Sequence, residues 1–404
     1  MTFYQFSCRA FQKAAWLGAY LLPWRKQELL RGPGSVGELP ALIKSMGLRR
    51  VLLITDAGLM RLGLPGPLLQ GLESAGIFCA VYDRTVANPT TAVVEDARRL
   101  YVQAGCEAVV AFGGGSPMDC AKMVAFLAAY PRAKLNRVKG VQVLRLRTPP
   151  PLFAVPTTAG TGAEITIAAV VSDAETHEKY SVLCPLFQPK AAVLDPALTL
   201  GLPPDITAQT GMDALVHAAE AYISLGRTRK TDARALEAVK LIFGNLDAAY
   251  SDGSNIEARE NMLYASYCAG MAFTRAYVGY AHGIAHAIGG LYGQPHGLAC
   301  AIALPHVLAA YGRRAHARLA RLYDAAGLPP LDNAAEKAEA FIRALRLMNT
   351  SLGIPATFGC IKEKDVPEIA ARCVKESNPL YPVPRIMRQG KLEGVVRRMA
   401  GQKG

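Results

Sequence analysis

The sequence predicts an α/β domain with a parallel sheet, followed by an all-α domain. In the first half, apolar runs of about five residues alternate with helical patterns. In the second half, long alanine-rich helical patterns follow one another almost without strand signals. The chain has 404 residues, of which 51% are hydrophobic and 19% are charged, and this composition excludes a disordered or coiled-coil protein. Such a length suits two or three domains.

The apolar runs of the first half are typical of buried parallel strands, which are hydrophobic throughout rather than alternating. The predicted strands are Val51–Thr55, Phe78–Tyr82, Ala108–Phe112 and Leu152–Pro156. The predicted intervening helices are Leu68–Ala75, Val93–Gln103 and Met118–Ala129. Because parallel strands need crossover connections, this alternation predicts a sheet with helices on both faces.

The second half is predicted to be entirely helical. The predicted helices are Ala208–Tyr222, Thr231–Tyr250, Glu257–Thr274, Ala281–Leu291, Ala301–Ala310, Ala315–Ala326 and Asn333–Leu352. We therefore divide the chain into an α/β domain at residues 31–203 and a helical domain at residues 204–404, with residues 1–30 as an N-terminal extension. The uncharged segment 14–24 of this extension indicates either a docked or loose helix, or a targeting or membrane-surface segment. No apolar run approaches the ~20 residues of a membrane span.

A glycine-rich turn follows one predicted strand. Ala108–Phe112 runs directly into Gly113, Gly114, Gly115, Ser116 and Pro117. Ser116 is expected to be the helix N-cap and Pro117 the first helical residue. Glycines let the backbone approach a phosphate, and a helix N-terminus attracts anions. The turn therefore indicates either a pyrophosphate site or a tight connection without a ligand.

Two other strand ends carry polar side chains that suit a dinucleotide. Thr157 and Thr158 follow the strand Leu152–Pro156, in a turn of small residues. Asp56 follows the strand Val51–Thr55. A carboxylate at this position accepts a hydrogen bond from the ribose 2′-hydroxyl of a dinucleotide and repels a 2′-phosphate. This arrangement favours NAD over NADP, although Asp56 is equally suited to cap the next helix.

Candidate metal ligands lie in two short segments of the helical half. Asp213 and His217 are four residues apart, as are His282 and His286, and His296 follows. Residues at i and i+4 share one helix face. One carboxylate with several imidazoles suits Fe²⁺ or Zn²⁺. Spacing alone leaves open which of His282 and His286 binds the metal. Each pair, taken by itself, could also be a histidine buried in the core next to a charged residue on the surface.

The cysteines and the charge exclude other classes of protein. Nine cysteines without a C-x-x-C pair argue against a disulfide framework and favour the reducing cytoplasm. The net charge is +13, and the segment Cys120–Ala163 holds seven basic residues and no acidic one. Such a basic segment is compatible with a nucleic-acid interface, but no recognised binding motif accompanies it. We therefore expect this basic segment to lie beside an anionic cofactor, with Lys122 near that cofactor.

Together these segments resemble the iron-containing (group III) alcohol dehydrogenase family. The matching motifs are Asn88–Thr90, Gly113–Lys122, Pro156–Glu164, Gly211–Ser224, His282–His306 and Asn378–Met387. The resemblance implies a dehydroquinate synthase-like two-domain architecture with a Rossmann-like, dinucleotide-binding first domain. One segment departs from the family pattern, because Arg275 and Tyr277 stand where asparagine and small residues are usual.

The resemblance also implies the roles of single residues. It implies that the metal ligands are Asp213, His217, His282 and His296, and that His286 is an active-site histidine that does not bind the metal. The residues that it implies for NAD are Asp56, Asn88, Gly113, Gly114, Gly115, Ser116, Asp119, Thr157 and Thr158.

The implied reaction is hydride transfer between nicotinamide and a primary alcohol bound to Fe²⁺ or Zn²⁺. The expected partners are a small-molecule alcohol or aldehyde and further copies of the chain, as a homodimer or larger homo-oligomer. No nucleic acid or membrane span is expected. The alternatives are a reductase of an unsaturated keto acid, similar to maleylacetate reductase, and a lyase similar to dehydroquinate synthase.

Overall fold

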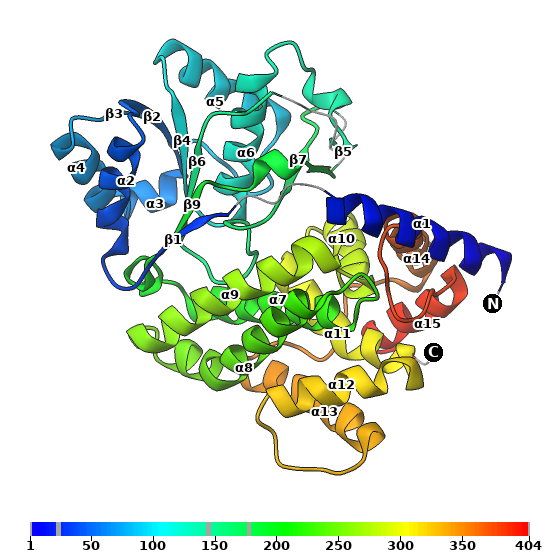
Figure 1. Ribbon diagram of the computed structural model, residues 1–404. Coiled ribbons are helices and arrows are strands. Elements are labelled where there is room, and N and C mark those ends of the chain that lie inside the picture. Colours follow the sequence, from blue (N-terminus) through cyan, green and yellow to red (C-terminus); the bar gives the residue numbers. More distant parts are fainter. Residues whose placement is uncertain (1, 22–25, 143–146, 176–178, 403–404) are drawn as a thin grey trace. The chain divides into compact units, whose positions relative to one another are not determined.

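The chain folds into two compact units. The computed structural model describes residues 2–21, 26–142, 147–175 and 179–402 (Figure 1). Residues 23–201 form the α/β unit, and residues 202–404 together with residues 1–22 form the helical unit. The N-terminal helix therefore groups with the helical half of the chain, although the α/β half follows it directly in sequence.

Parallel pairing dominates the α/β unit. Within the described residues, a six-stranded parallel sheet has the order β1-β9-β6-β4-β2-β3. Its strands are β1 (Glu28–Arg31), β2 (Arg50–Ile54), β3 (Phe78–Tyr82), β4 (Ala108–Gly113), β6 (Leu152–Pro156) and β9 (Ala191–Leu194). The predicted parallel sheet is confirmed. Strands β1 and β9, which lie at one end of the sheet, were not among the predicted strands. Residues 28–30 of the predicted extension thus lie in the sheet.

Alternate residues of the central strands enter two separate cores. Val51 and Leu53 of β2 pack with Leu39 and Leu68 on one face, whereas Leu52 packs in the cluster on the other face. The first core is covered by α2 (Leu39–Ser45) and α4 (Gly66–Ser74). The second is covered by α5 (Thr91–Gln103) and α6 (Gly115–Ala129). Since both faces are buried, the strands are apolar throughout.

The α/β unit also contains a smaller sheet and short helical segments. Its strands β5 (Gly140–Val141), β8 (Lys179–Leu183) and β7 (Ala168–Ser172) have the order β5-β8-β7. The remaining segments are α3 (Ala57–Arg61) and the 3-10 turns at Ser35–Glu38, Leu135–Arg137, Pro185–Phe187 and Pro196–Thr199. The small sheet contacts α6 through β7, on the side of α6 that carries Lys122.

Helix α7 forms the centre of the helical unit. Residues 211–224 are all buried, and α7 packs against α8, α9, α11 and α12. The helices are α1 (Phe3–Leu21), α7 (Pro204–Ile223), α8 (Arg229–Ser251), α9 (Ile256–Ala276), α10 (Tyr280–Tyr292), α11 (His296–Tyr311), α12 (Arg313–Ala325), α13 (Ala334–Ser351), α14 (Val366–Ser377) and α15 (Gln389–Met399). The predicted helical second half is confirmed, with α14 and α15 added.

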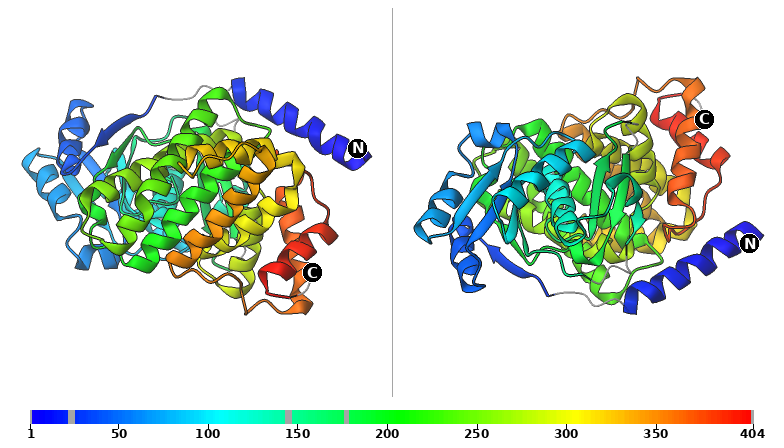
Figure 2. Two further views of the ribbon diagram at one scale, coloured as in Figure 1. Left: turned by 90° about the horizontal axis from the view of Figure 1, so that it is seen from below. Right: turned by 90° about the horizontal axis from the view of Figure 1, so that it is seen from above.

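The N-terminal helix α1 is docked on one side only. Cys8 and Gln12 are buried, and the Gln12 amide donates to the carbonyl oxygens of Pro379 and Tyr381. The opposite side exposes Phe3 and Phe6, and both views of Figure 2 show the first residues of α1 projecting from the helical unit. In the part of the chain that the structure describes, we find no helix that combines the length and hydrophobicity needed to cross a bilayer.

Gly297 allows the backbones of α11 and α7 to approach closely. A Cβ at Gly297 would lie 2.3 Å from the carbonyl oxygen of Gln209. We expect Gly297→Ala to lower the free energy of unfolding by about 1–3 kcal/mol, because the helices must separate. The matched control is Gly244→Ala, since a Cβ there meets no atom within 4 Å. Urea unfolding of both variants measures the effect, and equal midpoints would contradict the close contact.

Candidate active site

One face of α7 carries three ionisable side chains into the centre of the helical unit. Asp213, His217 and Glu220 lie at i, i+4 and i+7, and all three are buried. Buried charged groups are stable only when they are paired or bind a metal. The surroundings of these three residues therefore indicate what the site can hold.

Glu220 attaches the beginning of α10 to α7. Its carboxylate accepts hydrogen bonds from the backbone N–H groups of Gly279 at 2.7 Å and Ala281 at 2.8 Å, and it lies 2.7 Å from Nδ1 of His282. Burial raises the pKa of Glu220 to about 7. Burial lowers the pKa of His282 to about 3, so its ring is neutral at pH 7. With the proton on Nδ1, Nε2 keeps a lone pair and lies 3.8 Å from Oδ1 of Asp213.

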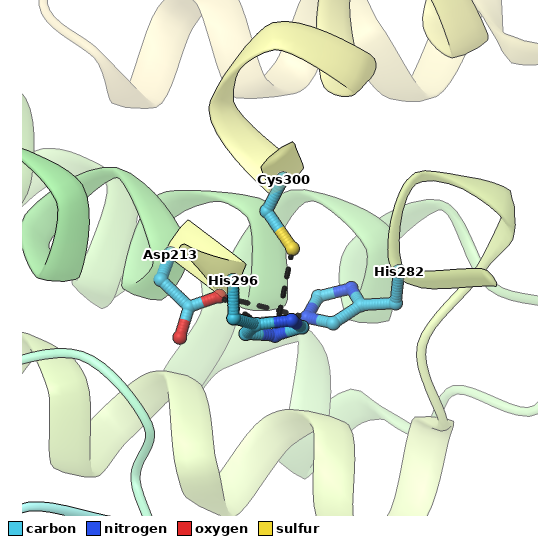
Figure 3. A group of neighbouring side chains, drawn as sticks. All are labelled: Asp213, His282, His296 and Cys300. Atoms are coloured by element: carbon cyan, nitrogen blue, oxygen red, sulfur yellow. Dashed lines mark hydrogen bonds and ion pairs between the residues drawn. The ribbon is translucent and has the colours of Figure 1, made fainter. Parts of the chain in front are cut away.

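Four potential ligand atoms meet at one point of this region. The side chains of Asp213, His282, His296 and Cys300 place one donor atom each within 4.8 Å of all the others, as Figure 3 shows. Nε2 of His296 is 3.5 Å from Oδ1 of Asp213 and 3.6 Å from Sγ of Cys300. We call this group the ligand quartet.

The ligand quartet fits a divalent cation. Oδ1 of Asp213 and Nε2 of His282 are buried and have no hydrogen-bond partner among the described residues. Such atoms are costly unless a ligand or water satisfies them. Burial also raises the pKa of Asp213 to about 7, against a hydrogen bond from Cys300, and a bound cation would favour the ionised carboxylate. Imidazole, carboxylate and thiolate are all donors that Zn²⁺ and Fe²⁺ accept.

His217 lies beside the ligand quartet. Its Nδ1 is 3.8 Å from Oδ2 of Asp213, and its ring centroid is 4.4 Å from that of His282. On its other side the ring stacks on Phe273 at 4.1 Å. Cys300, rather than His217, completes the compact group of four donors. Coordination of a metal by His217 therefore stays a prediction.

His286, one turn after His282, takes part in a separate chain of hydrogen bonds. Its Nδ1 lies 2.6 Å from Oε1 of Glu376, which also accepts from the Tyr381 hydroxyl at 2.6 Å. Burial would raise the pKa of Glu376, but His286 and Tyr381 together hold it below its ordinary value. The ring of His286 stacks on that of His296, with centroids 5.1 Å apart. His286 is thus next to the quartet and oriented by a carboxylate.

Sequence reasoning missed Cys300, Glu220 and Glu376. Cys300 is four residues after His296, the same spacing as in the other pairs, but C-x-x-C spacing does not reveal a cysteine that pairs with a histidine. Glu220 is seven residues after Asp213, on the same helix face. Glu376 is 90 residues from His286, so no local spacing connects them.

In the α/β unit, the predicted cofactor residues lie at the carboxyl ends of neighbouring strands. The glycine turn follows β4, and the threonine turn follows β6, its parallel neighbour. The backbone N–H of Thr157 donates to the Gly113 carbonyl at 3.1 Å, and Thr158 lies against Gly114. Gly113 has φ +144°, and a Cβ there would be 2.7 Å from Pro117. Only glycine fits this turn.

The predicted capping of α6 is wrong. The helix begins at Gly115, with Gly114 as its N-cap, so Ser116 and Pro117 are its second and third residues. Extended backbone at Gly114 lets the helix start at Gly115, two residues before the expected start at Pro117. The Ser116 hydroxyl instead accepts from the backbone N–H of Asn88 at 3.3 Å. Gly114 has no side chain that could cap α6, and no other described side chain caps the helix. The backbone N–H groups of its first turn are therefore not bound by a capping side chain.

Asp56 and Asn88 lie after the next two strands of the same sheet. Oδ1 of Asp56 accepts from the backbone N–H of Leu59 at 3.0 Å, so Asp56 does cap α3. Asn88 is exposed, has φ +53° and accepts from Nζ of Lys179 at 2.7 Å. Lys179 is a cationic residue of this region that sequence reasoning did not single out.

Lys122 does not belong to a solvated basic surface. It is fully buried on α6, where Nζ donates to Thr166 Oγ1 at 2.9 Å and to the Ala168 carbonyl at 2.8 Å. Burial lowers its pKa to about 8, against the effect of the nearby Asp119 and Glu164 carboxylates. Burial raises the pKa of Asp119 to about 6 and that of Glu164 to about 7.

The rest of the basic segment follows α6 in sequence. Arg132 and Arg137 are exposed there, whereas Lys139 lies 4.8 Å from the ring centroid of Tyr180. Arg147 donates to the Ala129 carbonyl at 3.4 Å. Arg145 lies outside the described residues.

Glu220→Gln tests how the quartet is oriented. The glutamine keeps the shape and an acceptor oxygen, but it loses the charge that holds His282. We expect Zn²⁺ affinity to fall by about 10–100-fold, as is usual when the partner of a metal-binding histidine is changed. Competition with a chromogenic chelator measures this affinity, and Glu339→Gln, on the exposed side of α13, is the control. Unchanged affinity would show that Glu220 only caps α10.

Lys122→Met tests the buried charges of the α/β unit through their pH dependence. In the unmutated protein, Glu164 carries more bound proton in the folded state than in the unfolded state between about pH 4.5 and 7. The free energy of unfolding therefore falls as the pH rises through this range. Lys122 binds fewer protons folded between about pH 8 and 10.5, so stability rises there. We expect Lys122→Met to lose the rise in the free energy of unfolding between about pH 8 and 10.5. Without the lysine charge, the pKa of Glu164 should lie higher, so the fall should continue above pH 7 by about 1.4 kcal/mol for each further pH unit.

Urea unfolding at about pH 5, 7 and 9 measures this profile. The control is Lys240→Met on the exposed side of α8, which should follow the parent. A Lys122→Met profile parallel to the parent's would contradict the coupling between Lys122 and the two carboxylates.

Comparison with known proteins places the chain in a family. Residues 26–196 match the model described as iron-containing alcohol dehydrogenase, and residues 207–399 match the C-terminal model of the Fe-containing alcohol dehydrogenase family. The 1,3-propanediol dehydrogenase of Klebsiella pneumoniae is 40% identical over 357 residues, which cover 86% of this chain and 90% of that protein.

Solved structures agree with this assignment. A 1,3-propanediol oxidoreductase has a TM-score of 0.89 at 34% identity, covering 94% of this chain and 100% of that one. Sulfoacetaldehyde reductase from Bifidobacterium kashiwanohense, solved in complex with NAD⁺, has a TM-score of 0.84 at 27% identity, covering 94% and 99% of the two chains. The predicted fold class, NAD-dependent alcohol dehydrogenase activity and cofactors are confirmed. The chain belongs to the iron-containing alcohol dehydrogenase family.

Proposed function

We propose that this enzyme interconverts a primary alcohol and its aldehyde by using a divalent cation in the helical unit. The cation would be held by Asp213, His217, His282 and His296. The observation that carries this proposal is the pair of buried ligand atoms, Oδ1 of Asp213 and Nε2 of His282, that lack hydrogen-bond partners among the described residues. The family name favours Fe²⁺, and the same donors suit Zn²⁺.

The cation, when bound, supplies a Lewis acid that polarises the substrate oxygen. His286 would take up the hydroxyl proton at Nε2, because its Nδ1 is engaged by Glu376. An ionised Glu376 stabilises the resulting imidazolium, and Tyr381 keeps this carboxylate in place. Nicotinamide, when bound by the α/β unit, would supply the acceptor or donor of the hydride.

The α/β unit would bind NAD at the carboxyl ends of its strands. Gly113, Gly114, Gly115 and Ser116 would hold the pyrophosphate at the beginning of α6, where no described side chain competes for the cap. Asp56 would bind the adenosine ribose through its free carboxylate oxygen and disfavour a 2′-phosphate. The remaining contacts to the cofactor would come from Asn88, Asp119, Thr157 and Thr158.

The wider biological assignment follows the same proposal. Residues 31–203 would act as the NAD-binding domain and residues 204–404 as the metal-binding domain, with residues 1–30 as an extension. The enzyme would act in the cytoplasm as a homodimer or larger homo-oligomer. Similarity to a 1,3-propanediol dehydrogenase and a sulfoacetaldehyde reductase supports a small alcohol or aldehyde as the substrate.

Metal-dependent NADH formation with a panel of short and medium alcohols tests this function. We expect Asp213→Ala and His282→Ala to lower kcat/KM at least 10³-fold, because each removes a cation ligand, which corresponds to about 4 kcal/mol in the barrier. The control is His316→Ala, a histidine on α12. Full turnover in either ligand variant would refute the metal assignment.

The same panel separates the alternative reactions. A lyase similar to dehydroquinate synthase would accumulate no NADH. A reductase of unsaturated keto acids would oxidise NADH with such an acid but not with simple aldehydes. Either result would replace the proposed alcohol dehydrogenation.

A further inference from the structure

Cys300 has the position of a metal ligand. It lies on α11, one turn after His296, so the two side chains share a helix face. Its side chain is fully buried, and Sγ lies 3.6 Å from Nε2 of His296. In Figure 3, the sulfur points to the same place as the two imidazoles and the carboxylate.

Two of the separations between donor atoms match coordination of one tetrahedral ion, whereas Nε2 of His282 and Oδ1 of Asp213 are slightly farther apart, at 3.8 Å. Sulfur at about 2.3 Å and nitrogen at about 2.1 Å from a tetrahedral cation are roughly 3.6 Å apart. The observed separation between Cys300 and His296 is 3.6 Å. Oxygen and nitrogen in the same geometry are roughly 3.4 Å apart, and Asp213 and His296 are 3.5 Å apart.

Packing alone does not explain these surroundings. A buried free cysteine normally behaves as a small hydrophobic residue among apolar neighbours. Here the thiol is within hydrogen-bonding distance of Nε2 of His296 and of the Asp213 carboxylate, and it also faces the imidazole of His282. Two of the atoms around it, Oδ1 of Asp213 and Nε2 of His282, are buried and lack a hydrogen-bond partner among the described residues. These atoms indicate a ligand at the point to which the sulfur is directed.

We propose that Cys300 binds the resident divalent cation as a thiolate and makes this site selective for thiophilic ions. The inference rests on the proposed function, because it assumes that the cation proposed above lies where the donor atoms of the ligand quartet meet. Binding forms one metal–sulfur bond and releases the thiol proton to solvent. A thiolate favours Zn²⁺ and Co²⁺ over Mn²⁺, which prefers oxygen donors. The enzyme therefore has a sulfur donor in addition to the aspartate and histidines.

Cobalt substitution tests the sulfur ligand directly. Apoprotein of the full chain, loaded with Co²⁺, should show an intense near-ultraviolet thiolate-to-cobalt charge-transfer band. Cys300→Ser should abolish this band, and Cys300→Ala should do the same if the serine variant folds poorly. The matched control is Cys268→Ser, a buried cysteine whose sulfur lies 3.7 Å from Glu237, and it should keep the band.

Selectivity is measured by competition with a chelator. Cys300→Ser should weaken Zn²⁺ binding by about 10–100-fold and Mn²⁺ binding by less than about 3-fold. An equal loss for both ions would indicate a structural role and overturn the proposal. So would a charge-transfer band that persists in Cys300→Ser, or its absence from parent protein that binds one Co²⁺. Parent protein that binds no Co²⁺ would refute the metal site itself, and with it the proposed function.

Discussion

The geometry of the active site depends on one buried carboxylate, Glu220. It lies on a helix that is surrounded by other helices, so water cannot stabilise it, and it accepts hydrogen bonds from the start of α10 instead. The same carboxylate orients His282, whose other nitrogen then faces Asp213. A single interaction thus joins two helices and presents a metal ligand, because the fold can bury Glu220 only by satisfying it in this way.

The two units use buried charge for different purposes. In the helical unit, Oδ1 of Asp213 and Nε2 of His282 have no hydrogen-bond partner within the described part of the chain, which prepares a site for a cation. In the α/β unit, Lys122 is surrounded by its own partners and fills the space between α6 and β7. A charge that is satisfied internally supports the structure, whereas one that is left unsatisfied indicates a ligand.

The sequence predicted the central strands and the long helices because their hydrophobic patterns are strong. It did not predict β1 (Glu28–Arg31), an edge strand with two apolar residues, or β9 (Ala191–Leu194), whose alanines carry little strand preference. Periodicity brought Asp213 and His217 together, but Glu376 reaches His286 only through tertiary packing. The predicted cap at Ser116 failed because backbone conformation at Gly114, rather than side-chain chemistry, starts α6.

The central claim is that Asp213, His217, His282 and His296 hold a catalytic divalent cation. Crystals of protein prepared without added metal, measured above and below the iron and zinc absorption edges, test it most directly. The account predicts one anomalous peak in contact with Asp213, His217, His282 and His296, and the proposed thiolate ligand adds Sγ of Cys300 to these contacts. Active protein whose anomalous maps show no peak at this point would contradict the account.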